Sequence, residues 1–323
     1  MRVFVTGGGG FIGGAVVRRL VARGDRVVAL VRDPARADAL RALGVDLWPG
    51  DLSRTPLIVD AMRGCDAAIH LAGSYRIGIP ASERPAMLDA NVGAVHRVLD
   101  AVATAGVERI VHTSTVGVFG DTRGRIVDER YRRDLVDGFL SYYDETKFLA
   151  HRAAEERIAT GAPVVIVMPG MAYGAGDHSS IGAQMQAAHD GTLRYVALGD
   201  TGMSPVFVDD LAAGIVAALD RGRIGEAYVL AGENTRIRDA LAVAARVGGH
   251  RSPRLELPDA LVRLGSRAPA WLARRAGLPH DLREVLTSSL GVTYWASSAK
   301  AAAELGYTPR DLASGIRAAF GAG

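Results

Sequence analysis

The chain has 323 residues, of which 49% are apolar and 23% charged, and its formal net charge is +3. These values are typical of a globular protein with a large core, and the even spread of arginines and acids argues against nucleic-acid binding. The single cysteine, Cys65, cannot form an internal disulfide, and no cluster of histidine, cysteine and acidic residues has metal-ligand spacing. Because we find neither a signal-peptide pattern nor an apolar run of membrane-spanning length, we expect a cytoplasmic protein without stable membrane insertion.

Short apolar runs alternate with helical patterns through the first half of the chain. Apolar strands that alternate with helices predict a parallel sheet covered on both faces, which is a doubly wound α/β (Rossmann) fold. In such a fold the ligand sites lie at the carboxyl ends of the strands. The predicted strands are 2–5, 27–31, 46–49, 67–71, 109–112 and 164–167, and the predicted helices among them are 12–23, 35–43 and 91–105.

After Pro169 the alternation weakens and the sequence becomes richer in helix. We predict helices at 182–190 and 209–219 and a strand at 227–230. Residues 261–278 mix apolar side chains with arginines, which favours a lid helix over a membrane-surface helix. We therefore expect a dinucleotide-binding domain over 1–169, to which 206–231 returns, and a smaller interleaved C-terminal substrate lobe formed by 170–205 and 232–323.

A glycine-rich turn, TGGGGFIG, occupies residues 6–13 between the first strand and the first helix. Gly7, Gly10 and Gly13 allow unusual dihedral angles and a close approach of a diphosphate to the backbone. The following helix N-terminus offers unpaired N–H groups to the phosphates. The alternative is a tight turn without a ligand, but the strand before it and the helix after it favour dinucleotide binding.

The end of the second strand reads VRDP, with Arg36 close behind. Dinucleotide sites for NAD usually place an acid here for the ribose, whereas arginine binds the 2′-phosphate of NADP. Arg32 and Arg36 therefore favour NADP. NAD stays possible, with Asp33 bound to the ribose and both arginines in solvent.

Tyr143 and Lys147 are four residues apart in the segment YYDETK, and Lys147 is one of only two lysines in the chain. In a helix this spacing places both side chains on one face. An ammonium group stabilises a phenolate, so we expect the pKa of Tyr143 to fall below its usual value near ~10. Tyr143 could then exchange a proton with a substrate oxygen during hydride transfer. The alternative is a surface tyrosine beside a solvated lysine.

Three hydroxyl side chains, Thr113, Ser114 and Thr115, follow the fifth predicted strand. Hydroxyls at the carboxyl end of a strand are well placed to hold a carbonyl oxygen near a general acid. They could instead satisfy local backbone groups. The other predicted pocket loops are mostly apolar, which suits a medium-sized organic carbonyl compound better than a diphosphate sugar.

Several further segments occur in a characteristic order: GDL at 50–52, HLAG at 70–73, NV at 91–92, PGMAYGAGD at 169–177, VFVDD at 206–210 and LGYTP at 305–309. Together with the glycine turn and the Tyr143/Lys147 pair, they resemble the extended short-chain dehydrogenase/reductase superfamily, the NAD-dependent epimerase/dehydratase family. Within it, the chain is most similar to dihydroflavonol reductase-like and hopanoid-associated sugar epimerase-like members.

The resemblance implies a catalytic trio of Thr115, Tyr143 and Lys147, with Ser114 as the alternative hydroxyl. In this family the lysine also binds the nicotinamide ribose, and the hydroxyl residue holds the oxygen that the tyrosine protonates. The implied cofactor-binding residues are Gly7, Gly10, Phe11, Ile12, Gly13, Arg32, Arg36, Asp51, Leu52, Leu71, Ala72, Gly73, Asn91, Thr113, Lys147 and Pro169. The expected substrate-binding residues are Tyr75, Ser114, Val116, Tyr142, Met171 and Tyr173.

These observations predict an NADP-dependent oxidoreductase that transfers a hydride between nicotinamide and a carbonyl or alcohol. One alternative is a nucleotide-sugar epimerase or dehydratase with retained NAD, although Val31 stands where NAD-using sugar epimerases place an acid. Another is a non-catalytic dinucleotide sensor, against which the Tyr143/Lys147 pair argues. The resemblance also implies a homodimer formed through the helix of Tyr143 and the helix that begins near Asn91.

Overall fold

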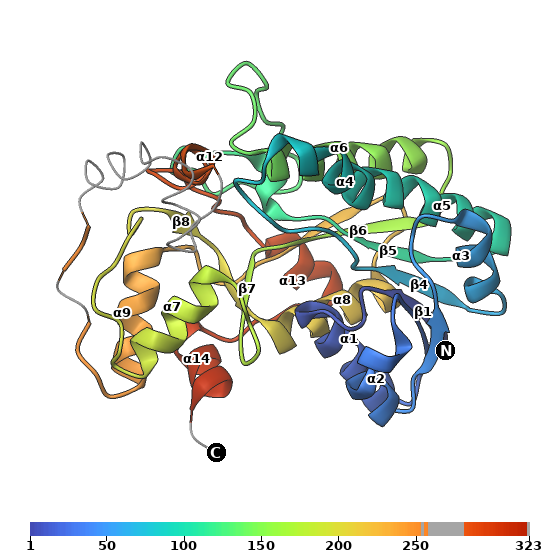
Figure 1. Ribbon diagram of the computed structural model, residues 1–323, viewed down its shortest axis with the longest axis horizontal. Coiled ribbons are helices and arrows are strands. Elements are labelled where there is room, and N and C mark those ends of the chain that lie inside the picture. The colour runs from blue at the N-terminus through green and yellow to red at the C-terminus, as the bar shows by residue number, and fades with distance from the viewer. Residues whose placement is uncertain (253–254, 258–280, 322–323) are drawn as a thin grey trace.

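Seven parallel strands form the central sheet, in the order β3-β2-β1-β4-β5-β6-β10 (Figure 1). The computed structural model describes residues 1–252, 255–257 and 281–321, so the predicted lid helix at 261–278 lies outside the described residues. The strands are rich in valine, alanine and isoleucine, and all six residues of β6 are buried. This confirms the predicted doubly wound fold, in which both faces of the sheet are covered. The strands are β1 Arg2–Thr6, β2 Arg26–Val31, β3 Asp46–Pro49, β4 Ala67–His70, β5 Ile110–Thr113, β6 Val164–Pro169 and β10 Ala227–Leu230.

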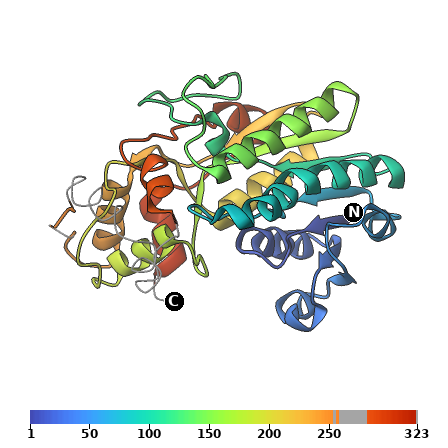
Figure 2. The same ribbon diagram turned by 45° about the horizontal axis from the view of Figure 1, so that its top comes forward.

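Helices form a layer on each side of the sheet, and Figure 2 shows both layers from a second direction. α1 and α8 pack together on one face, whereas α3, α5 and α6 cover the other. Side chains that alternate along each strand divide the interior into two apolar clusters, one on each face. The helices around the sheet are α1 Phe11–Ala22, α2 Asp38–Ala42, α3 Thr55–Met62, α4 Arg84–Leu88, α5 Ala94–Ala105, α6 Tyr142–Ala159, α8 Val208–Arg221 and α13 Ala299–Leu305.

The strand order reverses between β1 and β4. From β1 the chain continues to β2 on one side, while β4 pairs with β1 on the other. Such a switch point leaves a crevice at the carboxyl ends of the strands, where an open α/β sheet binds its ligands. The glycine turn after Thr6 and the loop after His70 lie at this crevice.

A smaller group of elements lies beyond the carboxyl ends of the strands, at the left in Figure 1. Within it α7 and α14 both pack against α9, while the segment with α8 and β10 returns to the main sheet. The domain boundaries at 169, 205 and 231 stay a prediction. The elements of this group are β7 Met171–Tyr173, α7 Ser180–His189, β8 Gly202–Met203, β9 Pro205–Phe207, β11 Thr235–Arg236, α9 Ile237–Val247, α12 Leu282–Thr287 and α14 Leu312–Phe320.

The helical segment expected to begin at Asn91 is part of a longer helical run that begins at Arg84, with α4. A π turn, Asp89–Gly93, joins α4 to α5 and contains Asn91. π turns of this kind often occur at functional sites. No described helix combines the length and the apolar character needed to cross a membrane.

Candidate active site

The glycine turn tolerates no side chain at two of its positions. Gly7 has a φ of 71°, and a Cβ there would lie 2.8 Å from the backbone nitrogen of Ala72. A Cβ on Gly13 would lie 2.0 Å from the Gly7 carbonyl oxygen. These two glycines therefore keep the turn tight and bring it against the loop that follows β4.

The N-terminus of α1 has the features that a bound diphosphate requires. Gly10 is the N-cap, no side chain among the described residues caps the helix, and the first turn contains no acid. The first N–H groups and the positive end of the helix dipole therefore face the crevice without competition from a carboxylate. Phe11 and Ile12 lie half-buried at the start of the helix. These residues fit a dinucleotide, and Gly7, Gly10 and Gly13 would bring the backbone close to its phosphates.

Arg32, Asp33 and Arg36 lie together after β2, and all three are exposed. Asp33 accepts a hydrogen bond from the Ala35 backbone N–H at 3.0 Å and so caps the 3₁₀ turn Pro34–Arg36. Neither guanidinium has an ion-pair or hydrogen-bond partner in the part of the chain that the structure describes. Both guanidiniums are therefore available to bind a 2′-phosphate, whereas one carboxylate oxygen of Asp33 already accepts the hydrogen bond from Ala35.

Other predicted cofactor residues lie in the loops around the same crevice. Asp51 is exposed, and a hydrogen bond from the Ser53 hydroxyl holds the pKa of its carboxyl below its usual range. Leu71 and Ala72 are half-buried next to Gly7. The Asn91 side chain is buried and bonds to both backbone groups of Ser74, at 2.7 and 3.0 Å. Asn91 thus holds the loop after β4, and its contact with the cofactor stays a prediction.

Three further predicted cofactor residues, Leu52, Gly73 and Pro169, lie beside these loops. Leu52 follows Asp51, and its carbonyl oxygen accepts a hydrogen bond from Arg97 on α5. Gly73 is exposed, and a Cβ there would lie 3.2 Å from the Asn91 side-chain oxygen. Pro169 is buried at the carboxyl end of β6.

Tyr143 and Lys147 project from the first two turns of α6. Ser141 caps this helix by accepting a hydrogen bond from the Asp144 backbone N–H at 3.0 Å. The Lys147 ammonium donates to the Thr113 carbonyl oxygen at 3.2 Å, which fixes it at the end of β5. Burial lowers the pKa of Lys147 from 10.5 to about 8.

The structure corrects the expected pKa of the tyrosine. Burial raises the pKa of Tyr143, and the nearby Tyr75 and Asp144 add to the increase. The physical reason is that the phenol is removed from water, while the Lys147 ammonium donates to the Thr113 carbonyl. Tyr143 is therefore protonated at neutral pH, in the form that donates a proton.

Tyr75 covers one side of Tyr143. Their rings meet edge to face, with centroids 4.8 Å apart and an interplanar angle of 85°. Tyr75 is 63% exposed, so it forms the border between the Tyr143 site and solvent. The neighbouring Tyr142 donates from its hydroxyl to the Arg84 carbonyl at 3.2 Å.

The three hydroxyl residues at the carboxyl end of β5, Thr113, Ser114 and Thr115, have different surroundings. Thr115 accepts a hydrogen bond from the Gly117 backbone N–H at 3.1 Å, and among the described residues its own O–H has no acceptor. Ser114 is 4% exposed and hydrogen bonds to His151 at 2.9 Å, so a substrate would have to displace that bond. The hydroxyl oxygen of Thr113 is buried without a partner among the described residues.

The other expected substrate residues differ in accessibility. Met171 is half-buried, whereas Val116 is 5% exposed. Tyr173 is 1% exposed, and its hydroxyl reaches the Leu312 carbonyl oxygen at 3.5 Å. Its ring packs in the core of the smaller lobe, because this residue of β7 faces α14.

Glu284 is a site feature that the sequence did not indicate. Its carboxylate accepts hydrogen bonds from the Gly78 backbone N–H at 2.6 Å and from the Tyr142 backbone N–H. It thus links α12 to the loop of Tyr75 and to the first turn of α6. Gly78 precedes Glu284 by 206 residues, so no local pattern could have revealed this contact.

Replacing Glu284 by alanine is expected to lower kcat/KM about tenfold or more, because the loop of Tyr75 and the first turn of α6 lose their common acceptor. Glutamine keeps one acceptor oxygen and should retain more activity than alanine. Arg283→Ala is the control, because Arg283 is the exposed neighbour on the same helix. Steady-state kinetics on the three variants would contradict this role if Glu284→Ala behaved like Arg283→Ala.

Comparison with known proteins agrees with this arrangement. A sequence profile of the NAD dependent epimerase/dehydratase family matches residues 3–231. The chain belongs to this family. It is 33% identical over 319 residues to a Synechocystis sp. protein named "Putative dihydroflavonol 4-reductase", with 94% of this chain and 89% of that protein covered. The predicted resemblance to the extended short-chain dehydrogenase/reductase superfamily is thereby confirmed.

Two further similarities extend over nearly the whole chain. A 4-hydroxy-2-methyl-3-oxo-4-farnesyl-3,4-dihydroquinoline-1-oxide ketoreductase of Stigmatella aurantiaca is 31% identical over 318 residues, with 96% of this chain and 92% of that protein covered. The crystal structure of gox2253 superposes with a TM-score of 0.83 at 32% identity, covering 98% of this chain and 96% of that chain. The protein is an NAD(P)-dependent enzyme of the extended short-chain dehydrogenase/reductase type.

Proposed function

We propose that this enzyme is an NADP-dependent oxidoreductase that reduces a carbonyl group, or oxidises the matching alcohol, with Tyr143 as general acid/base. The observation that carries the proposal is the position of Tyr143 and Lys147. Both lie on one face of α6, and Lys147 is bonded to the end of β5, at the sheet edge where the glycine turn also lies. A reduced nicotinamide bound there would supply the hydride for the carbonyl carbon.

The protein residues handle the proton of that reaction. Tyr143, kept protonated by burial, donates to the carbonyl oxygen as negative charge develops on it. Thr115 has a free O–H and would hold the same oxygen. The Lys147 ammonium stabilises the phenolate that Tyr143 leaves behind, which lowers the barrier to donation.

A medium-sized, largely apolar carbonyl compound is the proposed substrate class. The predicted contacts Tyr75, Val116, Tyr142 and Met171 offer aromatic and aliphatic surface with few charges. The ketoreductase of Stigmatella aurantiaca, whose name describes a farnesylated ketone, supports this choice. NADPH oxidation against a panel of ketones, aldehydes and nucleotide sugars would test it.

The family also includes epimerases and dehydratases, which gives a second candidate function. In that case NAD would stay bound between half-reactions. Cofactor that co-purifies in stoichiometric amounts, together with turnover of a nucleotide sugar without added NADPH, would favour this second function over ours. A freely exchanging cofactor would favour the reductase.

The two free guanidiniums after β2 predict the cofactor preference. Replacing both Arg32 and Arg36 by alanine is expected to weaken NADPH binding about tenfold to a hundredfold, because charge-assisted bonds to the 2′-phosphate are lost. NADH binding should change little. Arg26→Ala is a matched control at the other end of the same strand. Equal loss for both cofactors in the double variant would contradict the NADP preference.

A further inference from the structure

Arg97 on α5 joins two segments that border the cofactor crevice. Its two terminal nitrogens donate to the two carboxylate oxygens of Asp89 at 2.8 and 2.9 Å, and its Nε donates to the Leu52 carbonyl. Two parallel bonds of this kind fix the plane of the guanidinium. The Arg97 side chain is 22% exposed, and its contact with Leu52 spans 45 residues of sequence. Arg97 thus links the π turn Asp89–Gly93 to the loop after β3, and the proposed reaction leaves it without a role.

Gly93 leaves space for this ion pair. A Cβ at this position would clash with an Asp89 carboxylate oxygen and would lie 3.0 Å from a terminal nitrogen of Arg97. Any larger residue would therefore push the carboxylate and the guanidinium apart. An ion pair near the surface contributes little unless its geometry is bidentate, as it is here. The glycine of the π turn and the bidentate pair beside it therefore fit each other.

The loop after β3 lies where the adenosine half of a dinucleotide is expected. Gly50 opens this loop, and its N–H donates to the Val31 carbonyl at 2.8 Å, which ties the loop to the end of β2. The sheet order β3-β2-β1-β4-β5 places the N-terminus of α1, where the diphosphate is expected, next to the end of β1. Lys147 bonds to the end of β5, so the nicotinamide half would extend over β4 and β5 and the adenosine half over β2 and β3. The adenosine half would then lie beside Asp51 and Leu52.

The π turn is itself bonded to two segments on the nicotinamide side of the crevice. Its Asn91 side chain is buried, bonds to both backbone groups of Ser74 and donates to the Thr146 hydroxyl at 2.9 Å. The Thr146 hydroxyl donates to the Tyr143 carbonyl at 2.9 Å, within α6. Because the π turn is fixed by the loop after β4 and by α6, it can serve as the anchor from which Arg97 holds the loop after β3.

We propose that Arg97 is a positioning residue for the adenosine half of the cofactor. Anchored on Asp89, its guanidinium holds the loop of Asp51 and Leu52 in the arrangement that the adenosine half meets on binding. A loop that is already ordered loses less conformational entropy when the ligand arrives, so the affinity is higher. The inference rests on the proposed function, since that function places the nicotinamide at Lys147 and thereby the adenosine over the loop. Arg97 acts through the Leu52 backbone and need not touch the cofactor.

The first test measures the binding of the two halves of the cofactor separately, by calorimetry and fluorescence titration. Arg97→Met keeps most of the length of the side chain and removes its hydrogen-bond donors. It should weaken the binding of adenosine 2′,5′-bisphosphate and of NADPH about tenfold, because charge-assisted hydrogen bonds no longer order the loop. Reduced nicotinamide mononucleotide, which lacks the adenosine half, should bind as before. Unchanged binding of the adenosine probe, or equal loss for the nicotinamide probe, would overturn the inference.

Arg97→Lys separates positioning from a simple effect of charge. The hydrogen bonds from Ser53 first, and the nearby charges of Arg54 and Arg97 after them, hold the pKa of Asp51 below its usual range, so the field of Arg97 reaches the loop. Lysine keeps the positive charge but lacks the planar fork and the Nε donor. Arg97→Lys should therefore bind adenosine 2′,5′-bisphosphate nearly as weakly as Arg97→Met. Full affinity in Arg97→Lys would mean that charge alone is enough, and the positioning role would be wrong.

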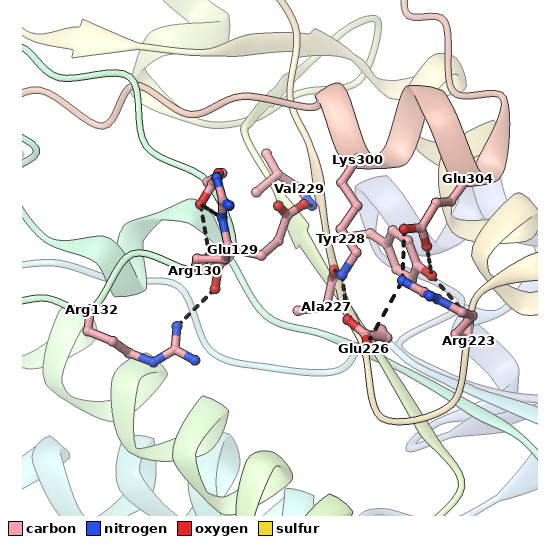
Figure 3. A network of polar contacts seen from close by, with 11 residues as sticks. Glu129, Arg130, Arg132, Arg223, Glu226, Ala227, Tyr228, Val229, Lys300 and Glu304 are labelled. Carbon is pink, nitrogen blue, oxygen red and sulfur yellow. Dashed lines mark hydrogen bonds and ion pairs between the residues drawn. The ribbon is translucent and has the colours of Figure 1, made fainter.

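Lys300→Met is the matched control, and Figure 3 shows the contacts of this lysine. Lys300 donates to a Glu226 carboxylate oxygen at 2.6 Å and to the Ala227 carbonyl at 2.8 Å, and its side chain is 23% exposed. It therefore resembles Arg97 in burial and in joining a carboxylate to a backbone carbonyl. Ala227 begins β10, at the opposite edge of the sheet from β3. Lys300→Met should keep its affinity for adenosine 2′,5′-bisphosphate. A loss equal to that of Arg97→Met would point to general loss of stability and would contradict the inference.

Asp89→Asn and the double variant test whether Asp89 and Arg97 act together. Asp89→Asn should weaken the binding of adenosine 2′,5′-bisphosphate less than Arg97→Met does, because the Asp89 side chain is 59% exposed. The double variant should bind no more weakly than Arg97→Met alone, whereas losses that add would contradict a common action. Adenosine 5′-monophosphate should show the same pattern, so the test holds even for an enzyme that prefers NAD. If no carbonyl compound were turned over, the proposed function would fail while these titrations would still decide the role of Arg97.

Discussion

Replacing Tyr143 by phenylalanine is expected to lower kcat for carbonyl reduction by about 10²–10⁴-fold, the usual contribution of a general acid. Phenylalanine keeps the ring that packs against Tyr75 and removes only the hydroxyl, the proposed proton donor. NADPH binding should therefore stay within about twofold of the original, because the hydroxyl contributes to the reaction more than to binding. Steady-state kinetics and fluorescence titration of NADPH would measure the two effects.

Tyr142→Phe provides a matched control for this substitution. The Tyr142 hydroxyl donates to the Arg84 carbonyl, so its loss removes one hydrogen bond without touching the proposed proton donor. We expect kcat to fall less than about tenfold, in line with the net value of one hydrogen bond. If both phenylalanine variants lost activity equally, or if Tyr143→Phe kept full activity, Tyr143 would not be the general acid.

The same reaction should depend on pH through Lys147. The pKa of this lysine is about 8, so its ammonium loses a proton as the pH rises through that value. The phenolate of Tyr143 then loses its stabilising charge, and kcat for reduction should decrease above pH 8. In Lys147→Met this descending limb should be absent, while activity is low at every pH.

Local patterns were enough to predict the fold. Short apolar runs in the sequence indicated where the strands lie. The glycines at positions 7 and 13 indicated the tight turn, because no other residue fits at these two positions. The helix before α5 was missed, since a π turn around Asn91 breaks the usual helical period. The eight residues of α3 were also missed, because Thr55–Met62 is too short to show a clear amphipathic period.

The candidate site was predictable only where neighbours in sequence are neighbours in space. The spacing of Tyr143 and Lys147 gave their common helical face. The spacing could not indicate that both side chains are buried, which raises the pKa of Tyr143 and lowers the pKa of Lys147. That burial depends on the β5 loop and on Tyr75, which are distant in sequence. The contact of Glu284 with the Tyr142 backbone spans 142 residues and depends on how the lobes pack, so no local signal could indicate it.

A buried ion pair beside Tyr143 leads to the second large prediction. Arg133 donates to the Asp144 carboxylate at 2.7 Å, and the two side chains are only 6% and 7% exposed. The guanidinium also lies over the ring of Phe139 at 5.0 Å, and Asp144 accepts from the Leu140 backbone N–H at 2.9 Å. The pair therefore joins the 133–140 loop to the first turn of α6.

Replacing Arg133 by leucine is expected to lower the free energy of unfolding by about 3–5 kcal/mol, because the Asp144 carboxylate stays buried without its partner. Thermal and urea denaturation would measure the loss. Adding Asp144→Asn to this variant should recover part of it, since the neutral amide tolerates burial better than an unpaired charge.

Arg130→Leu is the control, because Arg130 and Asp128 form an ion pair in the same loop with side chains 90% and 34% exposed. An exposed pair contributes little to stability, so this variant should unfold nearly as the original protein does. If Arg133→Leu were no less stable than Arg130→Leu, the buried pair could not be what holds the loop to α6. A large loss of unfolding free energy in Arg133→Leu alone would show that the helix carrying Tyr143 depends on this contact. Among variants of Arg133 and Asp144, kcat should then fall in the same order as stability.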